Sequence, residues 1–206
     1  MTGASAAKSP DPALRERILE AAYACFARFG LGKTTVEDVV KESGVSRATV
    51  YRTFPGGKDQ LLREVVAWEM GRFFGALAEA VVGAPDFASL VEDGLVFAHR
   101  AVGEHIVLQK ILVTEPERLL PLLTTAQHRP LAFITGYLMP FLEREEREGR
   151  LQPGLDHARA ADFVARMLLS LIGSDGEEIE DPVARRRLVR DQILVGVLTP
   201  EALAAP

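Results

Sequence analysis

The chain has 206 residues, of which 48% are hydrophobic and 26% charged, and its formal net charge is −5 at pH 7. No segment reaches the roughly 18 apolar residues of a membrane-spanning helix, and residues 1–10 lack the apolar centre of a secretion signal, so we expect a cytoplasmic protein. Cys25 is the only cysteine, which excludes an internal disulfide and a multi-cysteine metal site.

The charge is unevenly distributed along the chain. Residues 1–63 carry ten Lys or Arg against seven Asp or Glu, a net of +3, which leaves −8 for residues 64–206. A basic front end on an acidic body would let one part of the protein meet phosphate groups. Ordinary scatter of surface charge is the alternative explanation.

The first predicted element is an amphipathic helix over Pro12–Phe29. Apolar side chains recur there at helical spacing, and Gly30 ends the pattern. Cys25 falls on the apolar stripe, so we expect a core residue there and not a redox site. Residues 1–10 are expected to form a disordered tail.

The segment Thr34–Phe54 predicts a helix-turn-helix. Thr35 can cap a first short helix, with Asp38 three residues later as its capping-box partner, and Gly44 can end that helix in the left-handed conformation. Ser46 can then cap a second helix. Two short capped helices therefore fit into about twenty residues.

The second helix of this pair is expected to present one free face. At about 100° per residue, Ala48 and Arg52 point away from inward-facing Val50, with Thr49 and Tyr51 on the flanks. These four residue types suit a DNA major groove. The apolar side chains can share a small core, formed by Val36, Val39, Val40, Val45, Val50 and Phe54.

The remaining segments also read as helices, so the fold class is all-α with about nine helices. No alternating strand pattern and no repeat of 20 to 50 residues is present. The charged run Glu143–Glu148 is expected to be a solvated helix face. The predicted helices after the pair cover Lys58–Val82, Phe87–Val102, Glu104–Val113, Pro130–Glu148, Asp156–Leu171 and Val183–Leu198, with a short apolar turn over Leu119–Leu123.

Residues 13–63 resemble the TetR (tetracycline repressor) family of bacterial transcription regulators. The resemblance rests on five segments at matching spacing, which are Phe26–Gly30, Lys33–Val36, Ser43–Ser46, Val50–Phe54 and Lys58. It implies a DNA-binding domain over residues 1–57 and a helical ligand-binding and dimerisation domain over residues 58–206. A palindromic operator, a homodimer and a small-molecule effector are the partners that it implies, most often with a repressor role.

Arginine at the second helix can take a guanine edge or hold phosphate, and Ala48 is small enough to touch a thymine methyl group. Tyr51 and Lys58 are expected to be phosphate anchors, as are Thr34 and Thr35 beside free backbone N–H groups. The predicted DNA-binding residues are Lys33, Thr34, Thr35, Ser46, Arg47, Ala48, Thr49, Tyr51, Arg52 and Lys58.

The second domain is expected to hold an apolar or amphipathic ligand among aromatic side chains with a few polar groups. Aromatic residues at helical spacing also fit an ordinary core, so both interpretations stay open. The candidate ligand-binding residues are Trp68, Phe74, Phe97, His99, Gln109, Phe133, Tyr137 and Phe141.

The last two predicted helices carry apolar stripes that could pair with a second copy as a four-helix bundle. A core buried within one chain would explain the same stripes. The candidate dimer residues are Phe163, Met167, Leu168, Leu171, Val189, Ile193, Gly196 and Val197.

Catalysis is not expected. The four histidines lack short metal-ligand spacing, and neither a glycine-rich phosphate loop nor a Gly-x-Ser-x-Gly motif is present. No cofactor or metal is therefore predicted. The alternative to a ligand-controlled regulator is one that answers to a protein partner or to no effector at all.

Overall fold

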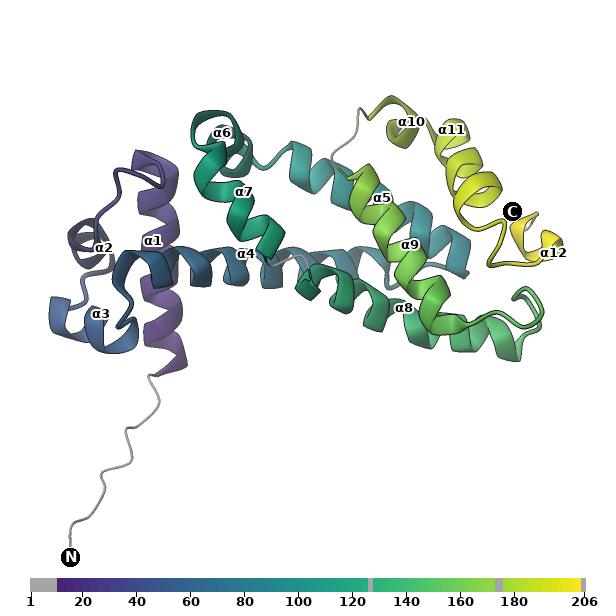
Figure 1. The fold of residues 1–206 in the computed structure, drawn as a ribbon, viewed down its shortest axis with the longest axis horizontal. Coiled ribbons are helices and arrows are strands. Elements are labelled where there is room, and N and C mark those ends of the chain that lie inside the picture. The colour runs from purple at the N-terminus through teal and green to yellow at the C-terminus, as the bar shows by residue number, and fades with distance from the viewer. Residues whose placement is uncertain (1–10, 126–127, 173–175, 205–206) are drawn as a thin grey trace, which may run out of the picture. The chain divides into compact units, whose positions relative to one another are not determined.

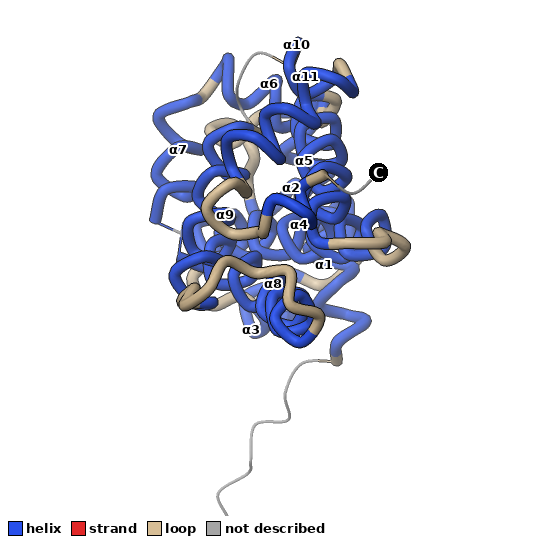
Figure 2. The backbone as a smooth tube through the Cα atoms, turned by 90° about the vertical axis from the view of Figure 1, so that its right-hand side faces the viewer, coloured by secondary structure: helices blue, strands red, loops and turns tan. Residues whose placement is uncertain are grey.

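The computed structural model describes residues 11–125, 128–172 and 176–204, and the expected tail over residues 1–10 lies outside this part. All the named elements in these ranges are helices, joined by turns and loops (Figures 1 and 2). Leu151 and Leu198 form an isolated antiparallel bridge. The predicted all-α class is confirmed.

The chain forms two compact units. The first comprises the chain up to Arg72 and returns with Ile111–Leu122, while the second comprises Phe73–Lys110 and everything from Leu123 onward. The division falls inside a helix, whereas the sequence-based boundary at residues 57 and 58 stays a prediction. The helices with residues in the first unit are α1 (Pro12–Phe29), α2 (Val36–Ser43), α3 (Arg47–Thr53), α4 (Gly57–Val81), α6 (Ile106–Thr114) and α7 (Pro116–Thr125).

The ends of α1, α2 and α3 form where the sequence predicts them. Thr35 and Asp38 make both hydrogen bonds of a capping box at the start of α2, and Gly44 ends that helix with φ 64°. Ser46 accepts a hydrogen bond from the Thr49 N–H and so caps α3. Each cap satisfies backbone groups that a helix leaves unpaired.

A small apolar core holds these three helices together. Cys25 is 1% exposed, which confirms its structural role, and burial raises the pKa of its thiol. Phe54 is fully buried, and the Arg15 guanidinium lies 4.9 Å from the centre of its ring. The buried apolar residues of this core are Ile18, Leu19, Ala22, Cys25, Phe26, Val36, Val39, Val45, Val50 and Phe54.

The second unit is built around α5 (Phe87–Gly103), α8 (His128–Arg147) and α9 (His157–Leu171). Helices α8 and α9 lie side by side (Figure 1). Small residues on α9, such as Ala161 and Ala165, are fully buried and allow a close approach. The core of this unit includes Phe87, Leu90, Val91, Leu95, Leu138, Leu142, Ala161, Val164 and Ala165.

The C-terminal region differs from the single helix predicted over Val183–Leu198. The unit ends in α10 (Glu177–Glu180), α11 (Pro182–Arg187), a π-helical segment η1 (Leu188–Ile193) and α12 (Pro200–Leu203). After η1 the chain pairs with a neighbouring segment, because the Gln152 N–H donates to the Val197 carbonyl and the Thr199 N–H to the Arg150 carbonyl. The C-terminal region is therefore divided into several short helices, and the described part of the chain has more helices than the nine expected.

The charged run at the end of α8 is only partly solvated, which corrects the sequence-based expectation. The carboxylate of Glu145 is 3% exposed and accepts two hydrogen bonds from the Arg150 guanidinium, at 2.5 and 2.9 Å. Arg150 reaches it from the loop after the helix. A carboxylate can be buried when such a charged partner satisfies it.

A second buried ion pair joins α5 to the C-terminal region. The Arg190 side chain is 3% exposed, and its Nε donates to Glu92 Oε1 at 2.7 Å. Its Nη1 also donates to the Leu203 carbonyl at 3.1 Å, which ties α12 to η1. Removing one partner of a buried pair leaves a desolvated charge without compensation.

Replacing Glu92 by Ala should therefore lower the free energy of unfolding by about 3 to 5 kcal/mol. Chemical denaturation followed by circular dichroism measures this change. Asp93→Ala is the matched control, because the neighbouring Asp93 is exposed and its removal should change stability by no more than about 0.5 kcal/mol. Equal stability of the two variants would contradict a structural role for the buried pair.

Candidate nucleic-acid interface and ligand cavity

Helix α3 presents the face that the sequence predicts. Ala48, Tyr51 and Arg52 are exposed, whereas Val50 and Thr53 are buried against the rest of the first unit. Tyr51 is 38% exposed although its ring is large and apolar. The outward side chains therefore contribute little to the core and are available to another molecule.

The two arginines of α3 contact neighbouring side chains of α2 and α3. Arg47 forms an ion pair of 2.6 Å with Glu37 of α2, and its guanidinium lies 5.5 Å from the centre of the Tyr51 ring. Arg52 donates to the Thr49 hydroxyl at 3.3 Å. Exposed pairs of this kind are weak, so both guanidinium groups can exchange their partners for a phosphate or a base edge.

The hydroxyl groups of Ser46 and Thr49 make hydrogen bonds within the first turn of α3. The Ser46 hydroxyl caps the helix and also lies 3.0 Å from the Thr49 hydroxyl. Their placement therefore holds the first turn of α3, the turn that enters the groove in helix-turn-helix proteins.

Near the start of α2, Lys33 and Thr35 are exposed but Thr34 is not. The Thr34 side chain is 1% exposed, and its hydroxyl lies 2.7 Å from the Gly30 carbonyl and 3.1 Å from the Cys25 carbonyl. Its hydroxyl proton is used inside the protein. Thr34 therefore fixes the end of α1 and is not a phosphate contact, which corrects the prediction from the sequence.

Lys58 lies in the first turn of α4, as predicted, and its ammonium group donates to the Gly32 carbonyl at 2.6 Å. An ammonium group has three donors, so this bond still leaves donors for a phosphate. Lys58 is therefore both a link to the α1–α2 loop and a candidate DNA contact.

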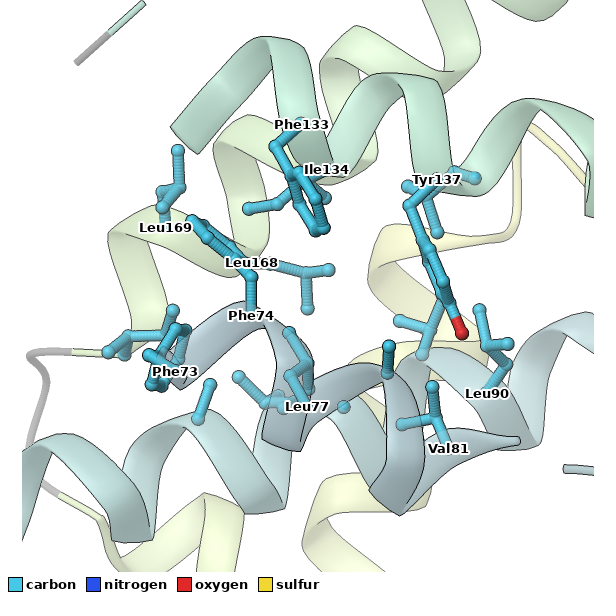
Figure 3. A pocket seen from close by; sticks show the side chains of 17 residues that line it. Phe73, Phe74, Leu77, Val81, Leu90, Phe133, Ile134, Tyr137, Leu168 and Leu169 are labelled. Carbon is cyan, nitrogen blue, oxygen red and sulfur yellow. The ribbon is translucent and has the colours of Figure 1, made fainter. Parts of the chain in front are cut away.

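The second unit contains an apolar cavity of about 60 Å³ (Figure 3). Among its 17 lining residues, Tyr137 is the only one with a polar side-chain atom. The Phe74 and Phe133 rings lie 4.4 Å apart, and the Phe133 and Tyr137 rings are nearly parallel at 6.4 Å. The lining includes Phe73, Phe74, Leu77, Val81, Leu90, Leu95, Phe133, Ile134, Tyr137, Leu138, Leu168 and Leu169.

Of the eight candidate ligand residues, Phe74, Phe133 and Tyr137 line this cavity. The aliphatic lining was missed, although Phe74, Leu77, Ala78 and Val81 follow helical spacing along α4 and could have been recognised as one face.

The other five candidates make different contacts. Trp68 packs against Tyr23 of α1, with ring centres 6.3 Å apart, while Phe97 contacts Phe73 and Phe141 contacts Tyr137. The His99 ring lies 3.3 Å from the Ile172 carbonyl, and the Gln109 amide donates to the Val102 carbonyl. These five residues therefore do not line the cavity, which corrects the expectation from the sequence. Trp68 lies in the first unit, and the other four lie elsewhere in the second.

The candidate dimer residues divide into two groups. On α9, Phe163 is 45% exposed and Met167 and Leu171 are half-buried, so this helix keeps an accessible apolar face. The second group is buried inside its own chain, so these residues belong to the core and not to an interface, which corrects the expectation. Gly196, which precedes Val197, is exposed. The buried residues are Leu168, Val189, Ile193 and Val197.

Residues 18–65 match the family described as bacterial regulatory proteins, tetR family. This match covers α1 from Ile18 onward, α2, α3 and the start of α4. Residues 18–65 therefore form a DNA-binding domain of the TetR family. The chain is a transcription regulator with a DNA-binding helix-turn-helix.

Two relatives of this chain are similar over different lengths. The HTH-type transcriptional regulator LmrA of Bacillus subtilis is 44% identical over 52 residues, which span 25% of this chain and only 28% of LmrA. An uncharacterized HTH-type transcriptional regulator of Mycobacterium bovis is 29% identical over 77% of this chain and 79% of its own length. The higher identity is thus confined to about a quarter of the chain.

The fold of this chain is similar to that of GusR from Salmonella enterica. The two structures have a TM-score of 0.64 at 18% identity, over 92% of this chain and 98% of GusR. Within the described ranges, no helix is long and apolar enough to cross a membrane. The same residues contain no group of three or more His, Cys, Asp or Glu arranged to hold a metal ion.

The capping box of α2 should be detectable by titration. Hydrogen bonds from the Thr35 hydroxyl and backbone N–H hold the pKa of Asp38 below its ordinary value. Ionised Asp38 therefore stabilises the fold at neutral pH, and this contribution is lost as the pH falls through the depressed pKa. Thr35→Ala should raise the pKa of Asp38 toward its ordinary value, as measured by NMR titration.

Ser46→Ala is the matched control for this titration, because it removes a capping hydroxyl that is not bonded to Asp38. The pKa of Asp38 should stay depressed in that variant. An Asp38 pKa at its ordinary value in the unmodified protein would show that the capping box does not persist in solution.

Proposed function

We propose that this TetR-family chain is a repressor that binds a palindromic operator as a homodimer and is released by a small apolar or amphipathic ligand. The observation that carries the proposal is the exposed face of α3, which places Arg47, Ala48 and Arg52 together on a capped helix. Lys33, Thr35, Tyr51 and Lys58 supply donors at the edges of this face for phosphate oxygens.

The spacing of DNA grooves supports a dimer. Two recognition helices must lie about 34 to 36 Å apart, or a multiple of that distance, to enter successive major grooves on one side of the duplex. The accessible face of α9, with Phe163, Met167 and Leu171, offers a surface for self-association. Gly196 and the residues buried around it are not part of the proposed interface core.

The cavity supports control by an uncharged ligand. Burying a charged group in an apolar lining without a partner is costly, whereas the Tyr137 hydroxyl can serve one hydrogen-bonding group. The cavity of about 60 Å³ is smaller than the roughly 150 Å³ that accommodates benzene, so a ligand must displace side chains. Phe133 is 44% exposed and is the side chain that we expect to move.

Replacing Arg52 or Tyr51 by Ala should weaken binding to the operator by about 1 to 3 kcal/mol, since each substitution removes one contact from the reading face. The operator is first isolated by selecting bound fragments from the source genome, and affinity is then measured by fluorescence anisotropy. Arg144→Ala is the matched control, because Arg144 is 49% exposed near the end of α8 and its loss changes the net charge equally.

Unchanged affinity in both the Arg52 and Tyr51 variants would overturn the proposed reading face. A logarithmic affinity that does not fall as the salt concentration rises would also argue against it, because phosphate contacts release counterions. The position of the selected fragments relative to promoters would indicate whether the protein acts as a repressor, and the neighbouring genes would suggest the ligand.

Three probes with one aromatic ring test the ligand site. Toluene and p-cresol are uncharged and should raise the thermal unfolding temperature and lower operator affinity, whereas benzoate should do neither because its carboxylate would be desolvated. Tyr137→Phe is the matched variant, since it removes the only polar side-chain atom of the lining. It should remove any advantage of p-cresol over toluene.

An equal effect of benzoate and toluene would contradict an apolar site. If neither uncharged probe binds while the operator does, the result favours the alternative, a regulator controlled by a protein partner or without a ligand.

A further inference from the structure

Glu115 joins two parts of the first unit that are far apart in the sequence. It is the single residue between α6 and α7, and its carboxylate accepts hydrogen bonds from the N–H groups of Leu31 and Gly32 at 2.8 and 2.5 Å. The separation along the chain is 84 residues for the first bond. Each carboxylate oxygen takes one backbone donor, so the contact fixes two consecutive peptide groups of the α1–α2 loop.

The backbone of Glu115 is itself held in place. Its N–H donates to the Ile111 carbonyl of α6, and its carbonyl accepts from the Arg118 N–H in the first turn of α7. The Arg118 side chain also lies 3.5 Å from the carboxylate. Pro116 follows directly and suits the first position of a helix. The side chain therefore projects from a junction with little freedom.

The α1–α2 loop fits closely around this carboxylate. Gly30 has φ 86°, a conformation that other residues rarely adopt, and a Cβ at Gly32 would lie 2.9 Å from Glu115 Oε2. On the other side of the same loop, the Lys58 ammonium group holds the Gly32 carbonyl. The Glu115 carboxylate thus binds two N–H groups of this loop, and the Lys58 ammonium group binds one of its carbonyl groups.

This segment leads directly into the candidate DNA contacts. Lys33 is the next residue after Gly32, and Thr35 begins the capping box of α2. A shift of the loop would therefore move Lys33 and the start of α2 and, because α2 packs against α3, the reading helix as well. Charge-assisted hydrogen bonds to backbone N–H groups are among the strongest that a loop of this kind can receive.

We infer that Glu115 is a positioning residue for DNA binding, which holds the α1–α2 loop and the start of α2 in the arrangement that reads the operator. This inference rests on the proposed function. It assigns a role to Ile111–Leu122, because the chain enters this segment from the second unit at Lys110 and returns to that unit at Leu123. A ligand-dependent change in the second unit can then alter the operator-binding face by weakening the hydrogen bonds that Glu115 accepts from Leu31 and Gly32.

The test combines amide hydrogen exchange with operator binding in the full chain. Glu115→Ala removes both hydrogen bonds, so it should speed exchange at the Leu31 and Gly32 amides and lower operator affinity by about 10-fold or more. Glu115→Gln keeps the size of the side chain but only one acceptor oxygen, so its effects should have the same direction and be smaller.

Glu117→Ala is the matched control. Glu117 is also acidic and lies in the same turn, but its side chain is 69% exposed and its nearest basic partner is Arg118 at 3.9 Å. Both exchange rates and operator affinity should equal those of the unmodified protein. Circular dichroism melting of each variant confirms that the fold is kept, and the Gln variant covers the case in which the Ala variant unfolds.

Faster exchange with operator affinity within twofold of the unmodified protein would overturn the inference, because the contact would then be structural only. Unchanged exchange, or tighter operator binding, would overturn it as well, the latter by showing that the carboxylate competes with phosphate. Failure of the unmodified chain to bind any DNA would remove the proposed function, which the unmodified control separates from a failure of the inference alone.

Discussion

The DNA-reading unit depends on side chains that satisfy backbone groups at helix ends. Helices α2 and α3 are only 8 and 7 residues long, so half or more of their backbone N–H groups lie in a first turn and lack an intrahelical partner. Thr35 and Ser46 each supply a partner for one of these N–H groups, and the shared apolar core then fixes the angle between the helices. Without the caps, helices of this length would be marginal in water.

The sequence predicts the parts of the fold that short-range signals control. The bounds of α1, the capping box at Thr35 and the left-handed turn at Gly44 each depend on residues within four positions of one another, and all three are confirmed. Burial of Thr34 was missed because its partners are carbonyl groups at the end of α1, which become available only once the loop has folded back.

The sequence alone is less informative where distant segments meet. The partner of Arg190 is Glu92, 98 residues away, and the donors to Glu115 are 83 and 84 residues away. Neither choice follows from a local pattern. The C-terminal stripe was recognised as apolar, but pairing with Gln152 competes with the helix and buries Val197 in its own chain. In the cavity, aromatic composition found Phe74 but could not show which faces of the helices come together.

The two faces of α3 have separate physical roles. Val50 and Phe54 contribute buried apolar area, while Ala48 and Arg52 contribute almost none and touch the rest of the unit only lightly. Substitutions on the outer face therefore carry little penalty in folding free energy, whereas those on the inner face are constrained by packing. Target-site preference can consequently diverge between related regulators by changes at a few outward positions, without compensating changes elsewhere in the protein.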